Sequence, residues 1–254
     1  TDIFDEFMMS NNLYPIALIE RENEMIVISH RLFIGEKSAA AFTQSGSAKP
    51  FEPSEAIMLQ YRKGGIHMTY KNVVVYCGSH FGNDPAYAAF AGELGEALGK
   101  NHFRMIYGGG TVGLMGICAD AAMVAGGEVT GIIPEVFIAK EQAHRGLTSL
   151  IEVPDMTVRK QRMIEMGDAF IILPGGIGTL EELADTANQR HIYGDPFAQP
   201  PIIICNIEHI YDGLLTQIKA WEEAGFIEPS EWGNLHVAET MEEVMGILKM
   251  KTKQ

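Results

Sequence analysis

Cysteine is scarce in this chain of 254 residues, and the three that occur, Cys77, Cys118 and Cys205, form no Cys-x-x-Cys pair. An odd and scattered set argues against a disulfide framework and against a zinc site built from thiolates. Long apolar runs are absent as well, so we expect no helix that crosses a bilayer. These absences predict a protein of the reducing cytoplasm, without a membrane as its partner.

Basic residues are also few: 19 Lys and Arg stand against 33 Asp and Glu, which gives a formal net charge of −14. Such a balance repels nucleic acid and anionic membranes, so neither is expected as a partner. An anionic small ligand would need dedicated positive groups in its site. The chain has no Gly-x-Ser-x-Gly sequence, and its histidines lack the spacing of metal ligands. We therefore expect neither a serine hydrolase nor a metal site.

The sequence pattern changes near Tyr70. Before it, two short apolar segments, 16–19 and 25–29, flank a polar turn, which is the pattern of a β-hairpin. No chemical motif occurs in this region. We interpret residues 1–70 as an N-terminal extension of unknown role and residues 71–254 as a single α/β domain.

From Asn72 onward, short apolar runs alternate with segments of helical length. Expected strands are 73–77, 105–107, 129–133, 150–153, 169–173, 202–205 and 235–237. Expected helices are 85–99, 114–125, 157–166, 179–189, 210–224 and 241–249, the first with Asp84 as its N-cap. Continuous apolar strands are typical of parallel sheets that are buried on both faces. The alternation predicts an α/β, Rossmann-like doubly wound parallel sheet, in which ligands bind beyond the carboxyl ends of the strands.

Three glycine-rich turns follow expected strands, at residues 77–79, 107–113 and 174–182. The last reads Pro-Gly-Gly-Ile-Gly-Thr-Leu-Glu-Glu and leads into a helix. Glycines let the backbone approach a ligand closely, and the N-terminus of a helix attracts anions. A tight structural turn with a threonine cap is the alternative. The Gly-Gly-x-Gly-Thr order at this junction favours a phosphate cradle made by Gly175, Gly176, Gly178 and Thr179.

The middle turn contains a Gly-x-Gly-x-x-Gly pattern in Gly108, Gly110 and Gly113. Alone, this pattern is a weak sign of a dinucleotide site, because close packing of a strand against a helix explains such glycines about as well. An acidic partner for a ribose is available in Glu128 or Glu135. A dehydrogenase that uses NAD therefore stays open as an alternative.

Glu181 and Glu182 are expected in the first turn of the helix that follows the cradle. One interpretation is that they complement the helix dipole. A carboxylate beside a phosphate adds repulsion, however, so binding alone gives no reason for it. It becomes useful if the ligand carries a ribose, whose hydroxyls need an acceptor or whose anomeric carbon becomes cationic during reaction. Arg159, in a basic cluster, could reach a phosphate or a departing base from the same edge of the sheet.

The ordered set of these segments resembles the family of cytokinin-activating "Lonely guy" enzymes, often labelled possible lysine decarboxylases. The similarity runs from about Asn72 to Leu248 and rests on residues 75–79, 107–116, 119–122, 129–134, 159–160 and 174–182. The resemblance implies a Rossmann-like fold and hydrolysis of a nucleoside 5′-monophosphate, AMP-like or of the cytokinin type, into free base and ribose 5-phosphate. It also implies a homodimer or larger homo-oligomer, with the active site near the subunit interface. We expect no cofactor.

Within this resemblance, Arg159 and Glu182 match the family's catalytic pair. The phosphate-binding turn of the family matches Gly175, Gly176, Gly178 and Thr179. Further substrate contacts are expected from Ser79, Gly109, Lys160 and Glu181.

The chain departs from the family pattern at two places. Thr157 stands where the family usually has His, and residues 188–196 differ from a stretch that contains Trp in the family. The second stretch is expected to shape the pocket for the base, so the identity of the base stays open. A carrier that binds a nucleotide or cofactor without hydrolysing it is the alternative to an enzyme.

Overall fold

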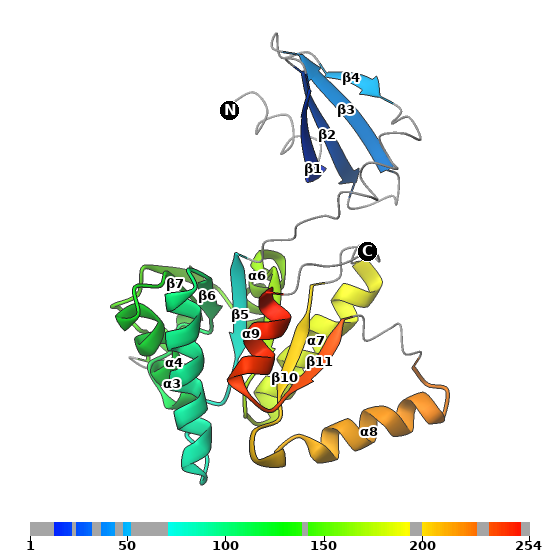
Figure 1. Cartoon of the computed structure of the whole chain (residues 1–254). Coiled ribbons are helices and arrows are strands. Elements are labelled where there is room, and N and C mark those ends of the chain that lie inside the picture. Colours follow the sequence, from blue (N-terminus) through cyan, green and yellow to red (C-terminus); the bar gives the residue numbers. More distant parts are fainter. Residues whose placement is uncertain are drawn as a thin grey trace. The chain divides into compact units, whose positions relative to one another are not determined.

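The computed structural model describes residues 71–138, 142–193, 200–227 and 234–249 and, by their backbone alone, residues 13–21, 24–31, 37–43 and 48–51. The chain divides into two units, Thr1–His67 with Thr252–Gln254 and Met68–Lys251, and each is described by itself (Figure 1). Within the described residues, no helix is long and apolar enough to cross a membrane.

The described residues of the smaller unit form four strands: β1 (Leu13–Arg21), β2 (Glu24–Arg31), β3 (Lys37–Thr43) and β4 (Ala48–Phe51). Consecutive strands pair in antiparallel register, for example Glu20 of β1 with Met25 of β2. The two segments for which the sequence indicates a hairpin fall within β1 and β2. Since only the backbone is described here, we assign this unit no function.

The larger unit is built on a sheet of seven parallel strands in the order β11-β10-β9-β5-β6-β7-β8. The strands are β5 (Asn72–Tyr76), β6 (Arg104–Tyr107), β7 (Val129–Pro134), β8 (Ser149–Val153), β9 (Ala169–Ile172), β10 (Ile202–Cys205) and β11 (Leu235–Ala238). All seven confirm the expected strands to within one residue at each end. The chain adds strands on one side of β5 and then crosses to the other, so the topology reverses next to β5, as in Rossmann-like sheets.

Helices cover both faces of this sheet (Figure 1). The six expected helices are present as α3 (Pro85–Lys100), α4 (Gly113–Val124), α6 (Met156–Met166), α7 (Ile177–Tyr193), α8 (Asp212–Glu223) and α9 (Met241–Lys249). Two short elements were not expected, α5 (Glu135–Ile138) and the 3-10 helix η1 (Ile207–His209). Side chains of α3, α4 and α9 pack on the face of Val73 and Val75, and those of α6 and α7 pack on the face of Val74 and Tyr76.

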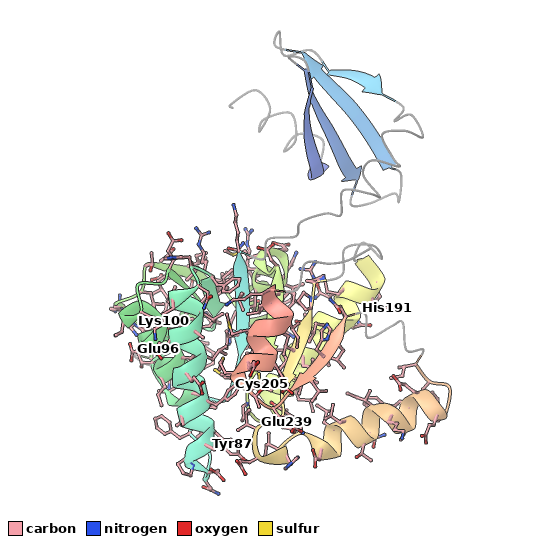
Figure 2. The ribbon with its side chains drawn as sticks, in the orientation of Figure 1. Tyr87, Glu96, Lys100, His191, Cys205 and Glu239 are labelled. Carbon is pink, nitrogen blue, oxygen red and sulfur yellow. The ribbon has the colours of Figure 1, made fainter. Side chains whose placement is uncertain are left out.

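Burial explains why the strands read as continuous apolar runs. In β5, Val73, Val74, Val75 and Tyr76 are all at most 2% exposed, because each face of the strand is covered by helices. Polar residues lie on the outer sides of the helices, as shown by the ion pair of Lys100 with Glu96 on α3, at 2.6 Å (Figure 2). The three cysteines are buried and unpaired.

The turns of the sheet lie at two opposite edges. Those that follow β5, β6 and β9 at the carboxyl edge contain the glycine-rich sequences. Those that lead into strands lie at the amino edge, where Arg104 before Met105 pairs with Glu128 at 2.8 Å. Gly126, in the turn between α4 and β7, has a φ of +82° and open space around it. The glycine-rich turns after β5, β6 and β9 are therefore gathered at the carboxyl edge of the sheet, away from the turn that contains Gly126.

Candidate active site

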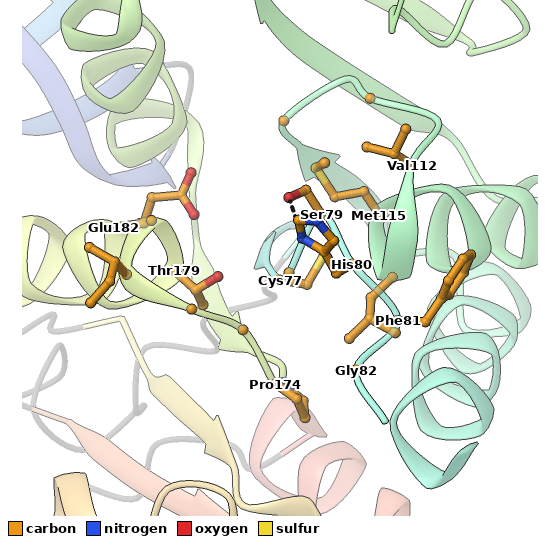
Figure 3. A pocket seen from close by; sticks show the side chains of 18 of the residues that line it. Cys77, Ser79, His80, Phe81, Gly82, Val112, Met115, Pro174, Thr179 and Glu182 are labelled. Atoms are coloured by element: carbon orange, nitrogen blue, oxygen red, sulfur yellow. Dashed lines mark hydrogen bonds between the residues drawn. The ribbon is translucent and has the colours of Figure 1, made fainter. Parts of the chain in front are cut away.

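A cavity of about 910 Å³ lies at the carboxyl edge, among the turns that follow β5, β6 and β9 (Figure 3). All three glycine-rich turns line it, together with Arg159 from α6 and Glu182 from α7. In Figure 3, Thr179 and Glu182 lie on one side of the cavity, and Ser79, His80 and Met115 lie on the other. The cavity therefore occupies the position at which such sheets bind ligands.

The turns are joined to one another by backbone contacts. The amide of Gly78 donates to the carbonyl of Pro174 at 3.0 Å, and the amide of Leu114 donates to the carbonyl of Gly78 at 3.2 Å. Gly113 has a φ of +59°, and a Cβ there would lie 2.3 Å from the carbonyl carbon of Ser79. Close packing between the first and second turns therefore accounts for this last glycine of the Gly-x-Gly-x-x-Gly pattern.

The third turn leads into α7, which begins at Ile177 rather than at Thr179 as expected. The first amides of a helix have no acceptor within the helix, so those of this first turn are available to a ligand. Gly176 and Gly178 are exposed, and a Cβ on either would meet open space. Thr179 is 4% exposed, and its hydroxyl fills the space beside Gly175, where a Cβ would lie 2.1 Å from Oγ1. The turn has the shape expected of an anion cradle.

The earlier start of α7 corrects one interpretation. Glu181 and Glu182 do not lie in the first turn of the helix, which contains no acidic residue. Because the helix dipole acts mainly within the first turn, it gives little reason for either carboxylate. The reason has to be sought in what the two side chains contact.

Glu182 contacts Arg159, and both line the cavity. Nη2 of Arg159 donates to Oε1 of Glu182 at 2.9 Å, and the two side chains are only 12% and 8% exposed. Asp155 caps the start of α6 by accepting from the amide of Val158 at 2.9 Å, which fixes the turn that carries Arg159. Gly108 leaves room for the guanidinium, since a Cβ there would lie 2.3 Å from Nη2. The structure thus brings the two residues of the expected catalytic pair together beside the cradle.

The electrostatics of this pair differ from those of a surface ion pair. Burial raises the pKa of Glu182 to about 7, although Arg159 acts in the opposite direction. Nε of Arg159 is buried and has no hydrogen-bond acceptor among the described residues. A carboxyl group that titrates near neutral pH can act as an acceptor, a base or an acid with little change in pH.

Other expected contacts divide into two groups. Ser79 lines the cavity, and its hydroxyl lies 3.3 Å from Nδ1 of His80. Gly109, Lys160 and Glu181 do not line it. Nζ of Lys160 lies 2.8 Å from Oε1 of Glu181, and this carboxylate is 57% exposed. In the single chain, these two side chains therefore form an outer ion pair between α6 and α7.

The acidic residues considered for a dinucleotide site do not complete it. Glu128 precedes β7 at the amino edge, opposite the glycine-rich turns, so it cannot reach a ribose bound there. Glu135 lies at the carboxyl edge as the first residue of α5 but does not line the cavity. Thr157 is exposed and does not line it either. Of residues 188–196, positions 194–196 lie outside the described residues.

Part of the cavity wall was not assigned to the site from the sequence. It is apolar, and its residues come from loops, from α5, from the end of β7 and from the first turns of α4 and α6: Phe81, Val112, Met115, Ile133, Phe137 and Met156. Apolar residues of this kind look like ordinary core residues in a sequence. Their position next to the glycine turns was the single signal that could have found them.

An all-parallel sheet with a glycine-lined cavity at its carboxyl edge places the chain among the Rossmann-like α/β proteins. Solved structures agree: a molybdenum cofactor binding protein from Rippkaea orientalis has 20% identity and a TM-score of 0.53 over 70% of this chain and 96% of its own. The molybdenum cofactor carrier protein of Chlamydomonas reinhardtii has 17% identity and a TM-score of 0.52 over 70% and 98%. At such identities the likeness concerns the fold alone.

The sequence comparisons are more specific. The family described as "Possible lysine decarboxylase" matches residues 115–248. A relative from Rhodococcoides fascians, named cytokinin riboside 5′-monophosphate phosphoribohydrolase, is 40% identical over 182 residues, 71% of this chain and 90% of the relative. A relative of the same name from Arabidopsis thaliana is 37% identical over 165 residues, 65% and 76% of the two chains. The chain therefore belongs to the family described as "Possible lysine decarboxylase", together with these phosphoribohydrolases.

Proposed function

We propose that the protein is a phosphoribohydrolase, which hydrolyses the N-glycosidic bond of a nucleoside 5′-monophosphate to give the free base and ribose 5-phosphate. The observation that carries the proposal is the buried contact of Arg159 with Glu182 at 2.9 Å, in the cavity that Gly176, Gly178 and Thr179 also line. The names of the relatives from Rhodococcoides fascians and Arabidopsis thaliana support the same reaction.

The phosphate is proposed to bind at the start of α7. The free amides of the first helical turn and the hydroxyl of Thr179 can donate to its oxygens, and the helix dipole adds partial positive charge. Arg159 lines the cavity as well, and it adds a full charge. These groups answer the need for local positive charge in a chain with a net charge of −14.

Glu182 is proposed to accept hydrogen bonds from the ribose and to stabilise the cationic sugar of the transition state. The bond between the anomeric carbon and the base nitrogen breaks with its electron pair on the base, which takes up a proton. Water then adds to the carbon and releases a proton. The step resembles glycoside hydrolysis, but among the described residues Glu182 is the one carboxylate that lines the cavity, where glycosidases use two. Arg159 steadies the phosphate or the departing base.

The base is proposed to be adenine or an adenine of the cytokinin type. The apolar wall that includes Phe81, Met115 and Phe137 supports a planar, largely apolar group at that end of the cavity. The names of the relatives support a cytokinin substrate. A comparison of catalytic efficiency between AMP and a cytokinin nucleotide would decide between them.

A homodimer that covers the mouth of the cavity is part of the proposal. Three apolar residues that line the cavity are exposed in the single chain: Ile177 by 82%, Phe81 by 55% and Ile210 by 46%. Such exposure is typical of surfaces that a partner covers. The homodimer is tested by measuring the mass of Ile177→Asp and of the unaltered protein by light scattering. A charge at a buried contact between subunits should convert the dimer into monomers. An unchanged mass would refute an interface at this residue.

The reaction is tested by incubating the pure protein with a panel of mononucleotides and measuring free base by chromatography. Release of base that is lost in Glu182→Gln, with the thermal transition retained, is the expected result. Folded protein that releases no base from any nucleotide would refute the enzyme. Intact mononucleotide bound at one per chain without turnover would indicate a carrier, and retained NAD would indicate a dehydrogenase.

A further inference from the structure

The chain takes an unusual path between β10 and α8. Glu208 has a φ of 49° and His209 a φ of 60°, so two successive residues with side chains adopt the left-handed region. This conformation is unfavourable for residues other than glycine and persists where the surrounding structure enforces it. The strained segment lies between two buried residues, Asn206 and Tyr211, which are 4% and 7% exposed.

Asn206 fixes both ends of this segment. Its Oδ1 accepts from the amide of Tyr211 at 2.8 Å, and its Nδ2 donates to Oδ1 of Asp212 at 2.8 Å. Its own amide donates to the carbonyl of Ala238 in β11, at 2.8 Å. The side chain of Asn206 therefore holds the start of α8 to the end of β10, and this fixes the backbone of Tyr211.

The phenol of Tyr211 reaches the turn that forms the cradle. Its hydroxyl donates to the carbonyl of Leu173 at 2.7 Å. The next residue, Pro174, has no amide hydrogen, so this carbonyl is the one hydrogen-bonding group of the peptide that joins the two residues. Burial is the main influence on the pKa of Tyr211 and raises it, while the nearby backbone amide of Gly175 acts in the opposite direction. The phenol thus contacts the turn immediately before its proline.

The second anchor of the turn comes from the other side. The carbonyl of Pro174 accepts from the amide of Gly78 at 3.0 Å. With Tyr211 on one side and Gly78 on the other, the backbone that enters the cradle is held by the start of α8 and by the turn after β5. The first amides of α7 have no acceptor within the helix, and Ile177, Gly178 and Thr179 of this turn line the cavity.

We propose that Tyr211 is a positioning residue for phosphate recognition: its hydroxyl, held in place by Asn206, fixes the peptide before Pro174 and so aims the start of α7 at the phosphate. The proposal rests on the proposed function, in that it assigns the turn to the phosphate of the substrate. Tyr211 itself does not line the cavity, so it acts through the backbone and touches no substrate.

A role in phosphate recognition can be separated from a general role in folding. AMP and adenosine share base and ribose and differ in the phosphate alone. The ratio of their affinities therefore cancels any change in the rest of the site. Both are measured by calorimetry in a Glu182→Gln background, which prevents turnover and leaves the cradle intact.

In that background, Tyr211→Phe is expected to weaken the binding of AMP about tenfold, which corresponds to about 1.4 kcal/mol, and to leave the binding of adenosine unchanged. The matched control is Tyr76→Phe. It removes a buried phenol that lies 3.0 Å from Oγ1 of Thr186, away from the cradle, and should leave the ratio unchanged. If Tyr211→Phe loses its cooperative thermal transition, Asn206→Ser replaces it, with the same selective loss expected.

An unchanged ratio in a folded variant would overturn the proposal, as would an equal loss for both ligands. Equal affinity of the background protein for AMP and adenosine would overturn it too, because the turn would then bind no phosphate. Absence of hydrolysis in the unaltered protein is a different result. It would refute the enzyme and leave the affinity ratio to decide the role of Tyr211.

Discussion

The buried carboxyl of Glu182 links the stability of the fold to pH. Its pKa in the folded chain is about 7, against an ordinary value of 4.5, mainly because burial disfavours the charged form. Between these values, the folded chain holds a proton that the unfolded chain releases. The contribution of Glu182 to the free energy of unfolding is therefore greatest below pH 4.5 and is lost as the pH rises to about 7. Glu182→Gln, which has no proton to lose, should abolish this dependence.

The magnitude follows from the proton affinity. Each unit of difference between the pKa values in the folded and unfolded chains corresponds to about 1.36 kcal/mol. The whole pKa difference therefore changes the free energy of unfolding by about 3 kcal/mol, of which about 2 kcal/mol falls between pH 5.5 and pH 8. The side chain is only 8% exposed, so screening by solvent reduces this little. Activity should change in the opposite sense, because the proposed role requires the ionised carboxylate. It should rise with pH up to about 7.

Urea unfolding of both proteins between pH 5.5 and pH 8 measures the effect. The two tryptophans, both within Met68–Lys251, report on the larger unit by fluorescence. The unfolding free energy of the unaltered protein, minus that of Glu182→Gln, should fall by about 2 kcal/mol as the pH rises. A difference that stays constant with pH would refute the reasoning, since Glu182 would then titrate alike in folded and unfolded chains.

Three further changes test the packing around the site. Gly108→Ala places a Cβ 2.3 Å from Nη2 of Arg159, so turnover should fall about 10²-fold with little loss of thermal stability. Gly175→Ala crowds the hydroxyl of Thr179 at 2.1 Å, and calorimetry in the Glu182→Gln background should show about tenfold weaker binding of AMP but not of adenosine. Arg190→Met removes donors to two carbonyls at the end of α6, at 2.5 and 3.1 Å, and should lower the unfolding free energy by about 2 kcal/mol in urea. Unchanged turnover in the first variant, unchanged affinity for AMP in the second or an unchanged free energy of unfolding in the third would show that the contact altered by that variant does not have the role given to it.

Much of the fold could be predicted because its physical causes are local. The strands are buried on both faces and are therefore largely apolar, and many of the turns at their ends contain glycine or proline. Asp84 was expected to cap α3, and its carboxylate accepts from the amide of Ala86 at 2.9 Å. The four-residue helix α5 was missed because one turn leaves no periodic pattern.

The start of α7 could not be predicted from local preference. Ile177 is 82% exposed, and it is followed by Gly178, so neither residue resembles the start of a helix. The backbone around Pro174 is set instead by distant contacts, through Tyr211 and Gly78. Since such contacts join residues far apart in the chain, the sequence pattern holds no sign of them.

The site could be predicted where it depends on a specific order of residues. The pairing of Arg159 with Glu182 follows from the family motifs, although the two residues lie on different helices. The apolar wall and Tyr211 belong to no pattern that differs from ordinary core. Only the three-dimensional arrangement assigns them to the cavity or to its support.

The opposite ends of the sheet can be altered separately. Every group proposed to act on the ligand stands beyond the carboxyl ends of the strands, while Gly126 lies in open space at the amino ends. A reporter peptide inserted at Gly126 would therefore extend into solvent without touching the ligand. In the same way, changes confined to these amino-end connections should leave the release of base unaltered.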